Sequence, residues 1–363
     1  MRRRRVLAAA AALPLLPLAA CDAPRAIDGR FTGIDVARGH ALRDRLVSGT
    51  SSAVPSIVKR CRVVIAGGGI AGLAAARALR LNGIEDFVLL EMEDSAGGNS
   101  RGGTVNGIAC PLGAHYLPVP GDDASEVQDL LEELGLRQRV SGRWVYDEAT
   151  LCHSPQERLF FQGAWQEGLL PMQGVSDATL AQYRRFESAV SALQREARFT
   201  IPTLKSPFTP LLRSLDATPF AAWLDANGLV DPLLRGYLDY CCRDDYGAGA
   251  KSVSAWAGLH YFAARHGFHA PGSPADASDD AVLTWPEGNG WLSGRLAAPL
   301  GDRLHTGCAV QRITELRHGV EVDAWDEGRH EWVRWQAESC VVALPVFIAA
   351  RVVGNPTDFL RSA

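Results

Sequence analysis

Three glycines and one acidic residue form the clearest chemical pattern in this sequence. Gly67, Gly69 and Gly72 make up the pattern G-x-G-x-x-G, and Glu91 follows at a spacing of about 20 residues. The first glycine permits a tight turn, the second lets the backbone approach a pyrophosphate, and the third lets a helix pack on a strand. A carboxylate at Glu91 can accept hydrogen bonds from both hydroxyls of an adenosine ribose, which disfavours NADP. The pattern predicts a dinucleotide site.

This chemistry requires a strand, a turn and a helix, and the surrounding sequence supplies all three. Residues 61–66 (CRVVIA) form a β-branched run typical of a strand buried on both faces. Residues 70–81 contain no proline and predict a helix that ends at Asn82-Gly83. Residues 86–92 predict the next strand. We therefore expect a βαβ unit of a Rossmann-like α/β fold.

The first helical turn would supply the contacts to the phosphates. The amides near Gly69, Ile70 and Ala71 would stand at the N-terminus of the helix, where the unpaired N–H groups and the helix dipole favour an anion. Glu91 and Met92, at the end of the second strand, would lie on the sugar side.

The rest of the chain predicts one nucleotide-binding domain with an insert. Residues 61–121 would be its first part, ending in a glycine-rich loop. Residues 122–280 show helical periodicity and predict a mainly helical substrate domain. Residues 281–363 become strand-like again, with runs such as SCVVALPVF that predict a buried strand. We expect this last part to return to the cofactor domain.

The stretch GGGIAGLAAARALR…VLLEMEDSAGGNSRGG resembles the flavin-containing amine oxidase and phytoene desaturase superfamily. In that superfamily the ribose-binding acid is followed by a Gly-Gly pair and usually by Arg. Here the pair is Gly97-Gly98, and Asn99 stands in the position of the arginine. The resemblance implies FAD as the cofactor and suggests that Arg101 takes over the phosphate contact.

Further segments extend the resemblance along the chain. Residues 111–120 resemble the stretch that passes the flavin ring, which implies that Gly113, Ala114 and His115 lie near the isoalloxazine. Residues 304–313 resemble the strand whose valine contacts the adenine, which implies a main-chain role for Val310. Residues 285–297 and 340–345 also match family segments. The implied activity is an FAD-dependent oxidoreductase that takes hydride from an activated C–H of a small amine or polyene.

Several side chains could act on a substrate, and each has a simpler interpretation. His115 is our catalytic candidate, although packing beside the ring is the favoured interpretation because the sequence shows no partner carboxylate. Asp244 and Asp245 could attract a cationic substrate or could be a solvated helix end. Trp256 and its neighbours at helical spacing could line a pocket but are more typical of a core.

Two alternatives to a flavin oxidoreductase remain open from the sequence. One is an NAD-dependent dehydrogenase, which would need a second nicotinamide-binding half. The other is a remnant that does not catalyse a reaction, because the later family segment with a Gly-Asp dipeptide has no counterpart in the final residues GNPTDFLRSA. On this basis we expect a fold that is C-terminally incomplete and leaves an open sheet edge.

The first residues resemble a bacterial lipoprotein signal peptide. Arg2–Arg5 precede an apolar stretch from Val6 to Ala20, and LAAC then ends at Cys21. We expect residues 1–20 to be removed, Cys21 to be lipidated, and residues 21–60 to form a tether and an irregular lead-in. The protein would then be exported and held at the periplasmic or cell-surface face of the membrane.

Composition narrows the remaining possibilities. The chain has 363 residues, a formal net charge of −4 and no basic surplus, so a nucleic-acid partner is not expected. Its 8 cysteines include no C-x-x-C pair, which gives no support to a zinc site or to a disulfide framework. No metal is expected. The partners that the sequence indicates are a small-molecule substrate and, through the expected lipid on Cys21, a membrane, and no protein partner can be deduced.

Overall fold

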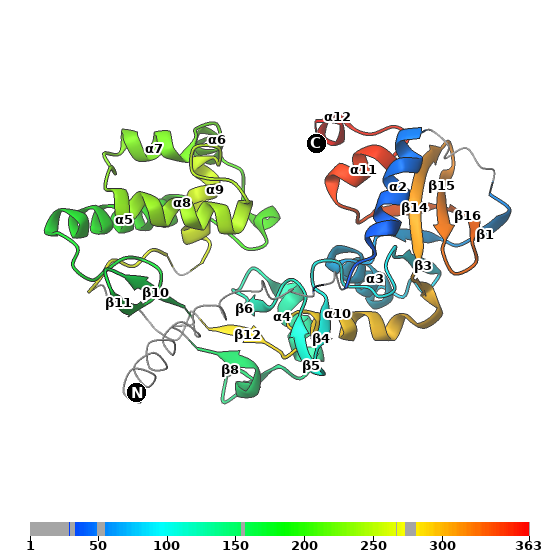
Figure 1. Cartoon of the computed structure of the whole chain (residues 1–363), viewed down its shortest axis with the longest axis horizontal. Helices are drawn as coiled ribbons and strands as arrows, with labels where there is room; N and C mark the ends of the chain where they lie inside the picture. Colours follow the sequence, from blue (N-terminus) through cyan, green and yellow to red (C-terminus); the bar gives the residue numbers. More distant parts are fainter. Residues whose placement is uncertain are drawn as a thin grey trace, which may run out of the picture.

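A computed structural model describes residue 29 and residues 33–48, 55–153, 157–265, 267–272 and 281–362. Figure 1 shows two lobes joined by extended segments. The cofactor lobe contains two four-stranded sheets with their covering helices, and the helical lobe is built mainly from residues 177–263. The leader and Cys21 lie outside the described residues, so export and lipidation stay predictions.

A parallel sheet forms the centre of the cofactor lobe. Its strand order is β13 (Leu304–His305), β3 (Phe87–Leu90), β2 (Val63–Ala66) and β17 (Ser339–Val342). All residues of β2 and β3 are buried, as their β-branched and aromatic composition predicts. Helix α3 (Ile70–Leu81) follows β2, so the predicted βαβ unit is confirmed.

A second sheet packs on the opposite face of this parallel sheet. Its order is β1 (Ile57–Arg60), β16 (Glu331–Ala337), β15 (Gly319–Asp326) and β14 (Cys308–Leu316), with β1 parallel to β16 and the other pairs antiparallel. Val64 and Leu90 meet Val322 and Val333 in the core between the two sheets. The sequence of three layers is therefore helix, sheet, sheet.

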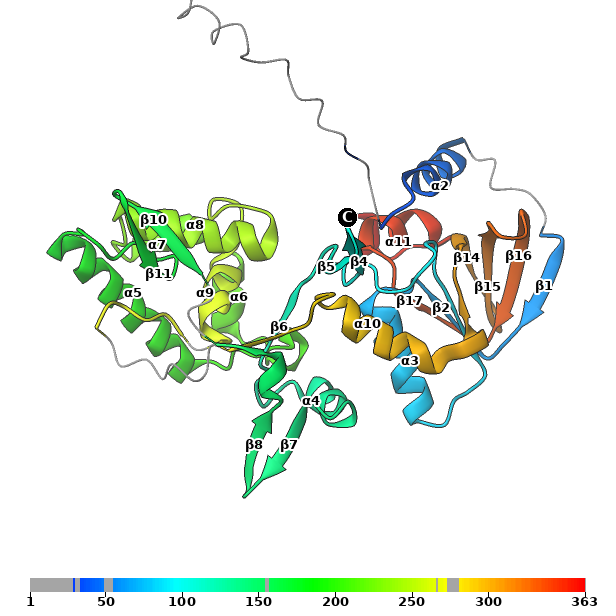
Figure 2. The same cartoon turned by 60° about the horizontal axis from the view of Figure 1, so that its bottom comes forward.

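Helices cover the remaining faces of the cofactor lobe (Figure 2). Helices α3 and α10 (Gly290–Ala297) lie on one face of the parallel sheet, where Leu73 and Leu296 share a core with Leu89. The 3₁₀ segment η4 (Ala298–Arg303) continues from α10 and leads into β13. Helices α11 (Val346–Val352) and α12 (Asp358–Arg361) end the described chain, and Val352 packs into the core between the sheets.

Two expectations about this lobe are wrong. Residues 21–60 are not all irregular, because Val36–Ser48 form helix α2 and Ile57–Arg60 form β1. The apolar run SCVVALPVF is not one buried strand either. Its first part, β17, is a half-exposed edge strand, and its last part begins α11 because Pro345 precedes the first helical residue and pre-sets a turn.

Short hairpins and a small sheet complete the strands that the structure describes. The hairpins are β4 (Gly102–Val105) with β5 (Ile108–Pro111), β7 (Arg137–Val140) with β8 (Arg143–Tyr146), and β10 (Arg158–Phe161) with β11 (Ala164–Glu167). The small sheet has the order β6 (Tyr116–Pro118), β12 (Val282–Thr284) and β9 (Leu151–Cys152). Helix α4 (Ser125–Glu133) and the 3₁₀ turn η2 (Glu148–Thr150) lie between these strands.

Two of the hairpins, β7–β8 and β10–β11, correct the expectation of a mainly helical insert over residues 122–280. Each has a two-residue turn in which a residue with positive φ precedes glycine, as at Ser141-Gly142 and Gln162-Gly163. Such turns match the twist of two antiparallel strands and favour a hairpin over a helix. The expectation holds for the later part of the insert, which is helical from Asp177 to Ala263.

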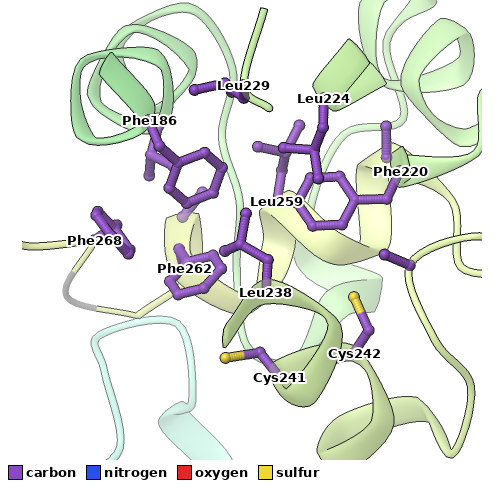
Figure 3. Packing of buried hydrophobic residues seen from close by; sticks show 14 of the residues in the cluster. Phe186, Phe220, Leu224, Leu229, Leu238, Cys241, Cys242, Leu259, Phe262 and Phe268 are labelled. Atoms are coloured by element: carbon purple, nitrogen blue, oxygen red, sulfur yellow. The ribbon is translucent and has the colours of Figure 1, made fainter. Parts of the chain in front are cut away.

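The helical lobe packs five helices around an aromatic core (Figure 3). They are α5 (Asp177–Glu196), α6 (Pro210–Asp216), α7 (Phe220–Ala226), α8 (Pro232–Tyr246) and α9 (Ala255–Ala263), with η3 (Thr203–Lys205) between the first two. Phe186 is fully buried and contacts Phe262 and Phe268 edge-on. The core interpretation of the aromatic residues in α9 is therefore confirmed for Phe262.

Two local details complete the description of this lobe. Thr218 does not cap α7: the first helical residue follows Pro219, and the Thr218 hydroxyl donates to Ser214 O instead. Cys241 and Cys242 are buried free thiols in the core, as expected. Among the helices that the structure describes, none has the length and apolar character needed to cross a bilayer.

Candidate FAD site

The turn between β2 and α3 is shaped by glycine. Gly67 has a φ of +103°, and a Cβ at Gly72 would stand 1.9 Å from Gly67 O, so neither position accepts another residue without a shift. The first helical hydrogen bond runs from Leu73 N to Gly69 O at 3.0 Å. No side chain caps the helix at Gly69. The amides of Ile70 and the two residues after it are therefore available to an anion.

Glu91 is turned toward this glycine turn. Its Oε2 accepts from Gly68 N and its Oε1 accepts from Glu93 N, both at 2.8 Å. The side chain is buried, and this burial raises its pKa even though the two backbone donors and the charge of Arg101 act in the opposite direction. Each carboxylate oxygen retains a lone pair, so the group can accept further hydrogen bonds from a ribose.

The Gly-Gly pair lies directly against the turn. Gly97 N donates to Gly68 O at 2.8 Å, and a Cβ on Gly98 would stand 3.0 Å from Gly69 Cα. Gly98 has a φ of +56°, which glycine adopts without strain. Beside Gly69, by contrast, a Cβ would find no atom nearer than Gly98 Cα at 3.9 Å. The space at Gly69 is the cradle that a pyrophosphate requires.

Arg101 is a buried cation whose charge acts on Glu91. It is 9% exposed, and its Nε is buried without a hydrogen-bond partner among the described residues. A buried cation without a partner is costly, and a bound phosphate would satisfy it. Asn99, which takes the position of the usual family arginine, is exposed, and its backbone carbonyl accepts from Ala114 N. The predicted phosphate contact of Arg101 is therefore compatible with the structure.

The segment expected to pass the flavin ring packs on the same loop. A Cβ at Gly113 would stand 2.2 Å from Asn99 O, which explains glycine at that position. His115 is exposed and contacts the Tyr116 ring edge-on at 4.9 Å between centroids. No hydrogen bond to its ring occurs within the described chain. Its catalytic role stays a prediction.

Val310 lies in the strand that passes beside Glu91. It lies buried in β14, next to a bulge in the pairing with β15. In the same strand Cys308 N donates to Glu91 O at 2.7 Å, and Glu91 N donates to His305 O at 2.9 Å. The strand therefore passes beside Glu91, and the adenine contact of Val310 stays a prediction.

Two features of this site had no part in the sequence interpretation. One is the close packing at Gly290, the first residue of α10, within the stretch 285–297 that the sequence matches only as a family segment: a Cβ on Gly290 would stand 2.3 Å from Gly102 N, so α10 meets the loop backbone to backbone. The repeated glycine before a helical run was the available signal. The other is the lead-in before β2, whose contacts with the loop after Glu91 are described below.

Comparison with known proteins identifies the family. A family model described as flavin containing amine oxidoreductase matches residues 70–359. The chain belongs to this family. Its cofactor is FAD, and the glycine cradle, the buried carboxylate of Glu91 and the unpartnered Arg101 fit that cofactor. The family match favours the flavin interpretation over the NAD-dependent alternative.

Individual relatives agree with this assignment. A Mycobacterium tuberculosis protein assigned as a flavin-containing monoamine oxidase, AofH, is 28% identical over 284 residues, which cover 78% of this chain and 56% of that protein. Human flavin-containing amine oxidase B is 25% identical over 304 residues, which cover 82% of this chain and 52% of that protein. The chain spans about half the length of the curated relatives that it matches.

Solved structures show the same fold. A putrescine oxidase bound to putrescine matches with a TM-score of 0.62 and 23% identity, over 84% of this chain and 63% of that chain. Cyclohexylamine oxidase from Brevibacterium oxydans matches with a TM-score of 0.55 and 21% identity, over 81% of this chain and 60% of that chain. Both matches support the α/β FAD-binding architecture.

Proposed function

We propose that this protein oxidises a small amine. The family match and the FAD cradle support an oxidoreductase in which FAD accepts hydride from the carbon next to the amine nitrogen. The observation that favours an amine over a polyene is the charge around Tyr116, which directly follows His115 at the predicted ring-facing segment.

Carboxylates gather around this position. Burial raises the pKa of the Tyr116 hydroxyl, and the charges of Asp244, Glu157 and Asp245 raise it further. Burial also raises the pKa of Glu157, and the charge of Asp244 adds to that effect. Burial is the larger cause of both shifts, and the charge of Arg265 opposes the carboxylates at Tyr116. The charges of the carboxylates nevertheless act on this position, and they would favour a protonated amine over an uncharged polyene.

The carboxylates differ in how far they are neutralised. Asp245 pairs with Arg265 at 2.9 Å. Asp244 is exposed and makes no hydrogen bond or ion pair within the described chain. Asp244 is therefore the group that a substrate cation would meet. His115 remains our candidate for accepting the proton that the amine must lose before oxidation.

Anaerobic mixing of the FAD-loaded protein with putrescine, with cyclohexylamine and with a polyene tests the proposal. We expect an amine to bleach the flavin absorbance and the polyene to leave it unchanged. Asp244→Asn should raise the amine concentration for half-maximal bleaching roughly 1.5- to 5-fold, which corresponds to the ~0.2–1 kcal/mol of an exposed ion pair. The limiting bleaching rate should remain unchanged.

A matched control is Asp225→Asn. Asp225 is an exposed acid on α7 that pairs with Arg235. Its replacement by asparagine should leave the bleaching curve unchanged. Bleaching by the polyene alone would contradict an amine substrate. Equal curves for Asp244→Asn and the wild-type protein would leave the amine proposal standing but remove Asp244 from it.

A further inference from the structure

The lead-in before β1 contacts the loop that carries the ribose-binding acid. Asp35 N donates to Glu93 Oε2 at 3.0 Å. Arg38 Nη1 donates to Met92 O at 3.2 Å and lies 2.8 Å from Asp94 Oδ1. Residues 33–38 thus hold three consecutive residues directly after Glu91, and we call this segment the lead-in clasp.

The opposite side of the same loop is held by the connection between β13 and β14. Glu91 exchanges backbone hydrogen bonds with His305 and Cys308, and Gly307 N donates to Glu93 O at 3.0 Å. The loop after β3 therefore lies between two supports that come from distant parts of the sequence. Glu93 N donates to Glu91 Oε1, and the Glu93 side chain accepts from the clasp at Asp35 N. The clasp therefore contacts the residue that orients the Glu91 carboxylate.

The lead-in clasp has its own anchorage on the cofactor lobe (Figure 2). Asp35 caps helix α2, because its Oδ1 accepts from Arg38 N at 3.1 Å. Further along α2, Leu42 is buried, and the Arg45 guanidinium lies 5.1 Å from the Trp325 ring centroid. The helix is thereby fixed to the second sheet, and it can hold the loop in place instead of following it.

We propose that Arg38 is a positioning residue for FAD. It keeps the backbone from Met92 to Asp94 in the conformation in which Glu93 N orients the Glu91 carboxylate toward the ribose site. A positioned carboxylate loses less conformational freedom when the cofactor binds, so holding it in place strengthens binding. The inference concerns affinity for FAD, and it depends on the proposed function only through that cofactor.

The surrounding surface agrees with this role. A cleft of about 590 Å³ lies between the clasp and the loop, lined by Ile34 and Asp35 on one side and by Glu93, Ser95 and Arg101 on the other. The buried Arg101 that the cradle leaves without a partner thus also lines this cleft. Release of the clasp would open the cleft and expose Arg101 to water, which weakens its attraction for a phosphate.

The test compares FAD binding by the full chain and by four variants. The apoprotein is titrated with FAD by flavin fluorescence, the dissociation rate is measured by dilution, and the melting temperature of the apoprotein is recorded. Arg38→Gln should weaken FAD binding about tenfold, mainly through faster dissociation. Arg38→Lys keeps the charge near Asp94 and should restore part of the affinity.

Two further variants complete the set. Asp94→Asn removes the partner of Arg38 from the loop side at an exposed position, so it tests the contact even if Arg38→Gln does not fold. Arg43→Gln removes a cation from the same helix. Among the described residues Arg43 pairs only with the neighbouring Asp44, so this variant should bind FAD like the wild-type chain.

The outcomes separate this inference from the proposed function. A lower melting temperature of the apoprotein with an unchanged FAD dissociation rate would assign Arg38 a purely structural role and overturn the inference. FAD binding that is equal in all variants would overturn it as well, while leaving an amine oxidase intact. Failure of the wild-type chain to bind FAD would overturn both.

Discussion

Replacing Glu91 with glutamine should separate cofactor binding from the stability of the protein without FAD. Each carboxylate oxygen now accepts one backbone hydrogen bond, from Gly68 N and from Glu93 N. Glutamine has a single oxygen, so one amide loses its acceptor at a cost of about 1.5–3 kcal/mol. The neutral side chain also escapes the desolvation that raises the pKa of Glu91. The two effects oppose each other, and we expect a net change in unfolding free energy below about 2 kcal/mol.

The affinity for FAD has no such compensation. In the predicted site the ribose hydroxyls would donate to a carboxylate with two acceptor oxygens, and an amide would leave only one. Loss of one hydrogen bond to a charged acceptor corresponds to roughly 10- to 150-fold weaker binding. Fluorescence titration with FAD measures this loss, and urea unfolding of the apoprotein measures stability. Glu85→Gln is the matched control, because Glu85 pairs with Arg303 at the other end of β3.

The pH dependence gives the same prediction a second readout. A carboxyl group whose folded pKa is raised stabilises the fold below its unfolded pKa, near 4.5, and that contribution is lost as pH rises through the folded value. The wild-type apoprotein should therefore lose stability over this interval relative to Glu91→Gln. An FAD dissociation constant within twofold of wild type, in a variant that remains folded, would refute the role of Glu91.

The glycine turn and the second sheet supply two further predictions. Gly69→Ala should leave the unfolding free energy of the apoprotein within about 1 kcal/mol of wild type but abolish FAD binding, since its Cβ points into the cradle. Gly72→Ala should instead destabilise the fold itself by about 1–3 kcal/mol, because its Cβ meets Gly67 O. Urea unfolding of both variants measures these changes, and a larger loss of stability in Gly69→Ala than in Gly72→Ala would show that the cradle is misplaced. Asp323, where burial is outweighed by hydrogen bonds from Arg334 and Arg312, has a lowered pKa. Its stabilising effect should be present above pH ~4 and lost as pH falls through the folded pKa. Asp323→Asn should therefore make the free energy of unfolding, measured with urea, depend less on pH over that range.

The strand–turn–helix cradle was predictable from sequence because local backbone geometry or burial restricts which residue types can occupy each of its positions. Gly67 needs a positive φ, Gly72 sits against a carbonyl oxygen, and VVIA has no polar residue to expose. Such restrictions act within a few residues, so a short pattern indicates them. The acid at Glu91 was equally accessible, because the end of the second strand must lie beside the turn in any βαβ unit.

The rest depended on contacts between segments far apart in the chain. Helix α2 has charged residues on several sides, and its docking relies on Trp325 and Trp332, which follow much later in the sequence. The half-exposed position of β17 depends on its place at the sheet edge, which its apolar composition does not indicate. The environment of Tyr116 likewise combines carboxylates from the insert with a residue of the cofactor segment.

The adjacent cysteines of α8 can report local opening of the helical lobe. Burial raises the pKa of Cys241 to about 12 and that of Cys242 to about 11, so in the closed lobe both sulfurs are protonated and shielded from alkylating reagents. They react only when the helices part, which makes the alkylation rate a measure of the opening equilibrium of this lobe. A substrate that bridges α8 and the ring-facing segment would slow the labelling, and mass spectrometry would register its binding without any turnover.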